Sequence, residues 1–159
     1  MIRAVIDTNV LVSGLLSPEG NEALILLAIH QGLVRPCFSE EILEKYAGVL
    51  ARPKFAFPAD EIAALLAMFR GRGELIVPKA STAVSVDPDD TKFLQCAETA
   101  QADYLVTGNK QHFPGGSYRV THIVSASELL DRITLEIWRA ADHWPVIGLK
   151  RMSRASFYV

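Results

Sequence analysis

The sequence predicts an α/β domain in which a mainly parallel sheet is covered by helices on both faces. Short β-rich runs alternate with segments of helical periodicity, and residues typical of helix starts and stops separate them. Polar residues follow directly after two of the apolar strands. Because ligands of such sheets bind outside the carboxyl ends of the strands, we expect the functional residues there.

The composition is typical of a globular domain with one core. The 159 residues are 50% hydrophobic and 21% charged, and no apolar run reaches the roughly 20 residues that cross a bilayer. Asp7 interrupts the region where a secretory signal has its apolar stretch, so we expect a cytoplasmic protein without membrane contacts. Cys37 and Cys96 are too few for a disulfide framework or a thiolate zinc site, and we interpret both as reduced core thiols.

The formal net charge is −2. A protein that attracts nucleic acid over a distance normally presents a basic face. Any contact between this chain and nucleic acid is therefore expected to be local and assisted by a metal ion.

The N-terminal half is predicted to alternate strand, helix, strand and helix. Asn21 and Gly32 are residue types that begin and end a helix, and Ser39 caps a second helix with acids in its first turn. Glu44 lies on this second helix. The predicted elements are strands at 3–6 and 33–38, a helix at 21–31 and a helix from 39 to about 52.

The C-terminal half continues the alternation. In the helix that begins at 87–90, apolar residues recur three or four positions apart, so one face packs inward while Asp90 projects from the first turn. Ser125 and Glu128 have the spacing of a capping box. The predicted elements are helices at 59–70, from 87 onward and at 126–132, and strands at 75–77, 104–107 and 120–124. We predict one domain over 1–132 and a less regular tail over 133–159.

Acidic residues on separate elements are the candidate functional groups. Asp7 follows the first strand, although it could also close a turn through its own backbone. Glu44 could equally belong to a solvated helix face. Asp87 and Asp89 have the positions of a helix cap and a first-turn acid, yet together with Asp90 they repel one another unless a cation or solvent screens them.

Carboxylates without paired histidine or cysteine ligands favour an oxygen-only site for Mg²⁺ or Mn²⁺ rather than zinc. Such a cation neutralises charge on a phosphodiester and lowers the pKa of an attacking water, so phosphoryl chemistry would need no side-chain nucleophile. The chain has no nucleophile elbow, phosphate-binding glycine loop or dinucleotide fingerprint. The histidines show no metal-ligand spacing: His30, His112, His122 and His143.

Four sequence blocks, taken in their order, resemble the PIN-domain ribonucleases, and specifically the PIN-family toxins of prokaryotic toxin–antitoxin systems. The resemblance extends over about residues 1–132. The blocks are VIDTNVLV at 5–12, SEEILEKY at 39–46, DPDD at 87–90 with Ala97 after it, and ADYLVTGNK at 102–110.

The resemblance implies a three-layer α/β/α sandwich and a Mg²⁺- or Mn²⁺-dependent endoribonuclease that acts as the toxin of a toxin–antitoxin pair. It further implies an RNA substrate, a cognate antitoxin protein and a homodimer. By the same resemblance Asp7, Glu44 and Asp90 are the catalytic, metal-binding acids, and the nearby polar supports are Thr8, Asn9 and Thr107.

Asn109 departs from the family pattern, because many PIN domains carry a fourth acid at this place. A neutral amide supplies no charge, so the occupancy of a second metal position is open. Asp87 or Asp89 could supply the missing acid. Possible RNA contacts near the expected site are the basic residues Arg52, Lys54, Lys110 and His112.

Two other functions are compatible with the sequence. A PIN-like module that binds RNA or protein without catalysis is favoured by Asn109. A phosphatase with Asp7 as nucleophile would use Thr107 and Lys110 as phosphate partners, but the acids at 89 and 90 precede Lys110 instead of following it. The tail could contact RNA, a second protomer or an antitoxin, or it could be a packed or frayed terminus. Its aromatic and basic residues include Trp138, Trp144, Lys150, Arg151 and Arg154.

Overall fold

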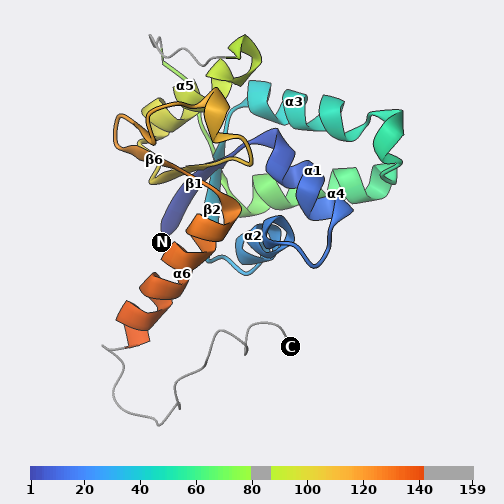
Figure 1. Ribbon diagram of the computed structural model, residues 1–159. Coiled ribbons are helices and arrows are strands. Elements are labelled where there is room, and N and C mark those ends of the chain that lie inside the picture. Colours follow the sequence, from blue (N-terminus) through green and yellow to red (C-terminus); the bar gives the residue numbers. More distant parts are fainter. Residues whose placement is uncertain (80–86, 142–159) are drawn as a thin grey trace.

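The computed structural model describes residues 1–79 and 87–141 and contains a six-stranded sheet (Figure 1). The strand order is β3-β2-β1-β4-β6-β5, and every neighbouring pair is parallel except β5 with β6. The mainly parallel sheet is therefore confirmed. The strands are β1 (Ile2–Ile6), β2 (Val34–Phe38), β3 (Glu74–Leu75), β4 (Tyr104–Val106), β5 (Ser117–Tyr118) and β6 (Thr121–Val124).

Helices cover both faces of the sheet, which confirms the predicted three-layer α/β fold. Helix α5 packs on β1, β2 and β4, whereas α2, α4 and α6 pack on the other side and contact one another through α2 (Figure 1). The helices are α1 (Thr8–Leu16), α2 (Asn21–His30), α3 (Glu40–Leu50), α4 (Ala59–Arg72), α5 (Thr91–Ala100) and α6 (Ala126–Ala141). Short 3₁₀ helices lie at η1 (Pro53–Phe55), η2 (Pro88–Asp90) and η3 (Lys110–His112).

The predicted caps at two helix starts are confirmed. The Ile42 amide donates to Ser39 Oγ at 3.2 Å, and the Glu128 amide donates to Ser125 Oγ at 3.1 Å. Gly32 has φ 78°, the left-handed conformation that ends α2 at low cost. Asn21 was expected as the cap of α2, but Gly20 holds that position and Asn21 is the first helical residue.

Two helices differ from the sequence prediction. Helix α1 was not predicted; Asp7 stands at its N-cap position directly after β1 but makes no side-chain cap hydrogen bond, and the buried residues Val10 and Leu11 pack into the core. The last helix was expected to end at Arg132, but α6 extends to Ala141 and buries Ile133. The boundary placed after residue 132 therefore lies within a helix. Trp144, Lys150, Arg151 and Arg154 lie outside the described residues.

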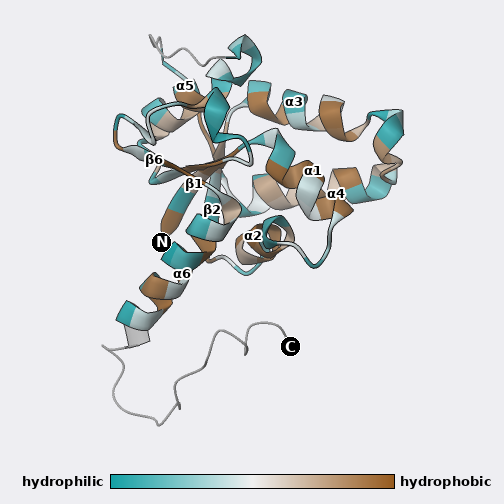
Figure 2. Ribbon diagram, in the orientation of Figure 1, coloured by the Kyte–Doolittle hydropathy of each residue, from teal (hydrophilic) through white to brown (hydrophobic). Residues whose placement is uncertain are grey.

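The buried apolar residues form one core cluster, and strands and helices carry hydrophobic residues, coloured brown, along the ribbon (Figure 2). Cys37 and Cys96 are free and buried there, as predicted, and burial raises the pKa of these thiols to about 11 and about 12 respectively. Among the described residues, no single helix is long and apolar enough to cross a membrane; only α1 and α2 taken together, with a 103° bend between them, have sufficient length and hydropathy.

Tyr46 joins α3 to the sheet. Its hydroxyl donates a hydrogen bond to the carbonyl of Ile6, the last residue of β1. The Tyr46 ring packs edge-on against Phe69 at 5.5 Å and beside Phe93 at 6.4 Å between centroids. These contacts anchor α3 to the carboxyl end of β1.

Removing the Tyr46 hydroxyl is expected to destabilise the protein. Tyr46→Phe deletes a buried donor and leaves the Ile6 carbonyl with one partner fewer, which costs about 1–3 kcal/mol. Urea denaturation measures this loss. Tyr104→Phe, at a half-buried ring on β4, is the matched control and is expected to change the free energy of unfolding by less than about 0.5 kcal/mol. Equal stabilities of the two variants would contradict the prediction.

Candidate functional site

Parallel pairing of β1 with β4 brings Asp7 beside Thr107. Ile6 is in register with Val106, so the next residue of each strand emerges at the same edge of the sheet. Thr107 Oγ1 donates to Asp7 Oδ2 at 2.8 Å. Only 4% of Asp7 is exposed, and this burial raises the pKa of its carboxyl group, while the hydrogen bond from Thr107 opposes the shift.

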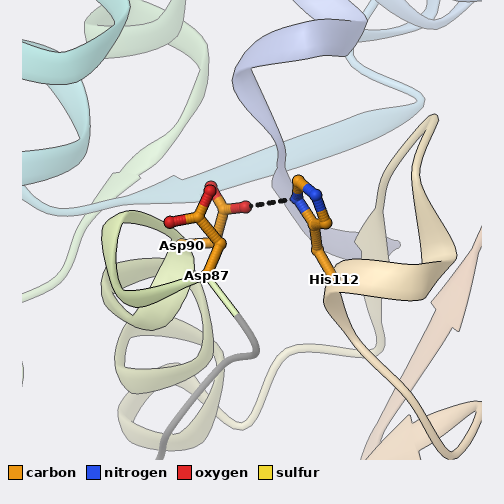
Figure 3. Close-up of side chains that lie close together, drawn as sticks. All are labelled: Asp87, Asp90 and His112. Atoms are coloured by element: carbon orange, nitrogen blue, oxygen red, sulfur yellow. Dashed lines mark hydrogen bonds and ion pairs between the residues drawn. The ribbon is translucent and has the colours of Figure 1, made fainter.

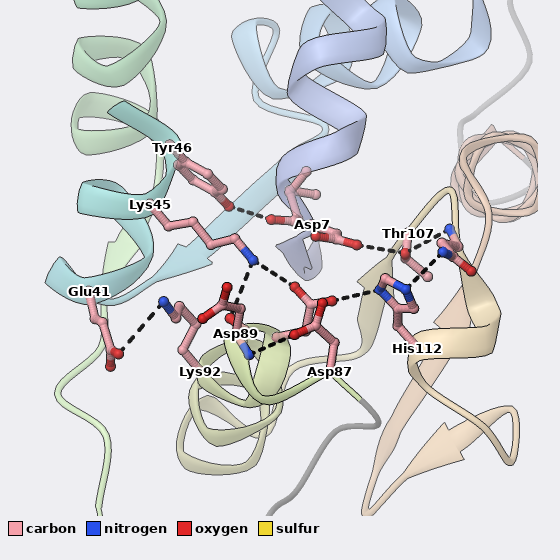
Figure 4. Close-up of polar contacts among 12 residues, drawn as sticks. Asp7, Glu41, Lys45, Tyr46, Asp87, Asp89, Lys92, Thr107 and His112 are labelled. Atoms are coloured by element: carbon pink, nitrogen blue, oxygen red, sulfur yellow. Dashed lines mark hydrogen bonds and ion pairs between the residues drawn. The ribbon is translucent and has the colours of Figure 1, made fainter. Parts of the chain in front are cut away.

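Asp90 contributes a second buried carboxylate from the end of η2, and both of its oxygens accept bonds from the protein. Asp90 Oδ1 lies 2.7 Å from the Lys45 ammonium, and Asp90 Oδ2 lies 2.8 Å from His112 Nδ1 (Figures 3 and 4). Asp87 caps η2 by accepting a hydrogen bond from the Asp89 amide at 3.0 Å. The charge of Asp90 also raises the pKa of Asp7, which shows that the two acids share one electrostatic environment.

Asp87, Asp90 and His112 form a group suited to a metal ion. Each of them offers one ligand atom, and these atoms all lie within 4.8 Å of one another (Figure 3). Two carboxylates with one imidazole make a mixed oxygen and nitrogen donor set, which suits Mn²⁺ and other transition metals as well as Mg²⁺. The expectation of an oxygen-only site did not include His112, because residues 90 and 112 meet only in the folded chain.

Glu44 does not join this group. It is exposed on α3, on the side of the helix opposite the buried residues Ile42 and Tyr46. Its neighbour Lys45 reaches Asp90 instead, since successive helical residues project about 100° apart. The side chain of Glu44 is exposed, and its role as a metal-binding acid stays a prediction.

The side chains of Asn9 and Thr107 hold the loop that follows β4. Asn9 Oδ1 accepts a hydrogen bond from the Gly108 amide at 3.1 Å, and the Asn109 amide donates to Thr107 Oγ1 at 3.0 Å. The Asn109 side-chain nitrogen lies 3.0 Å from His112 Nε2. Asn109 therefore orients the imidazole. The Thr8 hydroxyl is buried without a hydrogen-bond partner among the described residues.

Residues 3–111 of the chain match the PIN domain family. The chain belongs to this family. It is also similar to the uncharacterized protein MJ1680 of Methanocaldococcus jannaschii, with 31% identity over 112 residues, which covers 69% of this chain and 72% of that protein. No solved structure matches the chain significantly. PIN domains are generally metal-dependent nucleases, so the family and the candidate metal group indicate the same class of chemistry.

The donor set of this PIN domain fits a divalent cation in part. The acids and His112 supply ligand atoms, and the buried hydroxyl of Thr8, the residue after Asp7, has no hydrogen-bond partner among the described residues. Lys45 limits the fit, because its ammonium already lies against Asp90. Lys45 was not among the residues predicted from the sequence. Its position directly before the buried Tyr46 is a sequence signal that it lies beside the buried face of α3.

The basic residues proposed as RNA contacts differ in their surroundings. His112 belongs to the metal group, and Lys110 is paired with Glu128 on α6. Arg52 and Lys54 lie beyond the C-terminal end of α3, where the Lys54 ammonium stands 5.1 Å from the centroid of the Phe55 ring. Of these residues, His112 contacts an acid of the PIN domain's metal group directly, through Asp90.

The buried charge of Asp7 is expected to reduce the stability of the metal-free PIN domain. Because the pKa of Asp7 is raised on folding, the folded state binds this proton more tightly than the unfolded chain does. The contribution of Asp7 to stability is therefore lost as the pH rises through its folded pKa. Asp7→Asn should raise the free energy of unfolding at pH 7 in EDTA by about 0.5–2 kcal/mol.

Urea denaturation at several pH values measures this effect. The advantage of Asp7→Asn should shrink as the pH is lowered and Asp7 in the wild type gains its proton. Asp60→Asn removes the same charge from an exposed position at the start of α4 and serves as the control. An Asp7→Asn protein that is less stable than the wild type at pH 7 would show that the Asp7 charge is fully compensated.

Proposed function

We propose that the protein is a Mg²⁺- or Mn²⁺-dependent endoribonuclease and acts as the toxin of a toxin–antitoxin pair. The observation that carries the nuclease proposal is the convergence of Asp87, Asp90 and His112 beside the buried Asp7 in a PIN domain. The choice of RNA as substrate and the toxin role are supported by the likeness of the four sequence blocks to PIN-family toxins.

Asp87, Asp90 and His112 are the residues that would hold the metal ion. When bound, a divalent cation would stabilise charge on the phosphodiester and acidify a water ligand. Thr107 keeps the Asp7 carboxylate aimed at the same edge of the sheet, and Asn109 keeps the His112 ring in place. Positive charge for the substrate would come from residues at the site, since the chain as a whole is weakly acidic.

The proposal includes a cognate antitoxin and a homodimer in the cytoplasm. A toxin of this class would be restrained by a partner that covers the acidic site. Expression of the wild-type chain alone would then slow growth, and co-expression with the product of an adjacent gene would restore it.

A non-catalytic PIN module is the second candidate. It is favoured by the contacts of Asp90, whose two oxygens are bound by Lys45 and His112, and by the neutral Asn109. Such a module would bind RNA or protein without cutting RNA. The phosphatase alternative is weaker, because Asp7 is buried and Lys110 pairs with Glu128 rather than extending toward Asp7.

Purified protein is expected to cleave RNA when Mg²⁺ or Mn²⁺ is present and to stop when EDTA is added. Asp90→Asn should lower the cleavage rate at least about 100-fold, because it removes a charged metal ligand. Asp60→Asn is the matched control: it makes the same substitution at an exposed position at the start of α4 and should leave the rate within about twofold of wild type. Gel electrophoresis of a labelled RNA measures the rates, and circular dichroism verifies that each variant is folded.

The two candidate functions give different results. Metal-dependent cleavage that Asp90→Asn abolishes supports the nuclease. RNA binding without cleavage, in the same metal concentrations, supports the non-catalytic module. Cleavage that survives in Asp90→Asn would place the activity in another site or another protein.

A further inference from the structure

The side chain of Lys45 points from α3 into the acidic site (Figure 4). Its ammonium lies 2.7 Å from Asp90 Oδ1 and 3.3 Å from the backbone carbonyl of Asp89. The positive charge of Lys45 also lowers the pKa of Asp7, so both buried acids interact with it. We propose that Lys45 is a built-in cation that competes with a divalent metal ion for the acidic site.

Several contacts fix Lys45 in this place. Its ammonium lies 5.0 Å from the centroid of the Phe93 ring, which places the lysine over an aromatic face. The next residue, Tyr46, is held to β1 through the Ile6 carbonyl. Only 19% of the Lys45 side chain and 7% of the Asp90 side chain are exposed. The pair is thus far more enclosed than a surface ion pair, which contributes little and is screened by salt.

The contacts of Asp90 explain why lysine and metal would compete. Oδ1 is bound by Lys45 and Oδ2 by His112, so both oxygens already have a donor. A divalent ion coordinated to Asp90 would lie close to the ammonium, and two positive charges at such separation repel each other. The affinity of an oxygen site for a divalent metal ion also rises with the negative charge of its ligands. The positive charge of Lys45 reduces the net negative charge of this site by one.

Lys45 and a metal ion therefore perform the same electrostatic task. Either of them neutralises carboxylates that would otherwise be buried without a counter-ion. The inference rests on the proposed metal site, but it concerns the resting state of that site and not the RNA reaction. It predicts that the chain holds its acids in place without metal and binds a divalent cation only weakly.

Lys45→Met tests the competition directly, since methionine keeps much of the apolar stem and removes the charge. Mn²⁺ affinity is measured by isothermal titration calorimetry in the full chain. Lys45→Met should bind Mn²⁺ at least about tenfold more tightly than wild type, and Lys45→Arg, which keeps the charge, should stay near the wild-type affinity.

Lys92→Met is the matched control. Lys92 pairs with Glu41 at 3.7 Å, and 17% of its side chain is exposed, so its removal changes the net charge equally at a similar degree of burial. The Mn²⁺ affinity of Lys92→Met should remain within about threefold of wild type, because its charge lies outside the acidic group.

A second measurement covers the case in which Lys45→Met folds poorly. Removal of the ammonium leaves Asp90 without its charged partner, so the melting temperature in EDTA is expected to fall. Mn²⁺ should then raise the melting temperature of Lys45→Met more than that of wild type, because the metal supplies the missing positive charge. An equal or smaller rise would overturn the inference.

The outcomes separate this inference from the proposed function. Equal Mn²⁺ affinities of wild type and Lys45→Met would overturn the competition and leave the metal site standing. Tight binding by Lys45→Arg would also overturn it, because the charge would then not be the determinant. Binding by Lys45→Met with none by wild type would support the competition and contradict metal-dependent activity of the natural chain. Absence of binding in both would overturn both.

Discussion

The parallel pairing of β1 with β4 is the constraint on which the candidate site depends. These two strands are central in the sheet, and each ends in an apolar residue followed by a polar one. Because the two strands run in the same direction, Asp7 and Thr107 emerge at the same edge of the sheet and form a hydrogen bond. The η2 turn and the loop after β4 then bring Asp90 and His112 to the same edge. No single element could assemble this group alone.

Charge balance at this edge determines how the site behaves. Buried carboxylates destabilise a folded protein unless a cation or a hydrogen bond compensates them. The chain compensates Asp90 with Lys45 and His112, whereas Asp7 receives hydrogen bonds from Thr107 and the Thr8 backbone and the charge of Lys45, and these do not offset its burial. The pKa of Asp7 stays raised because burial of its carboxylate outweighs these favourable contacts. A divalent ion would supply the missing positive charge. Buried acids of this kind therefore destabilise the metal-free protein and at the same time favour metal binding.

Neighbouring residues of helix α3 point in different directions, and this decides which charge reaches the acidic site. Glu44 and Lys45 are neighbours in a block that resembles PIN-domain ribonucleases, and the acid was the residue assigned to the metal. The burial of Ile42, Tyr46 and Leu50 sets the rotation of the helix and turns Glu44 to solvent. Lys45 consequently contributes a positive charge beside Asp90, a contact that the sequence analysis did not predict. Asn109, the neutral residue at the place of a fourth acid, lies against His112.

The sequence by itself determined the alternation of strands and helices, the caps at Ser39 and Ser125, and the polar residues that end β1 and β4. These features are encoded in short segments, through periodicity, caps and strand ends, and each can be read without knowledge of the rest of the chain. Only the tertiary structure decided that Lys45 contacts Asp90 and that His112 joins the acids. These contacts connect residues 45 and 22 positions apart, and they depend on how helices pack against the sheet. Side-chain packing, which no local pattern specifies, therefore sets the charge of the site.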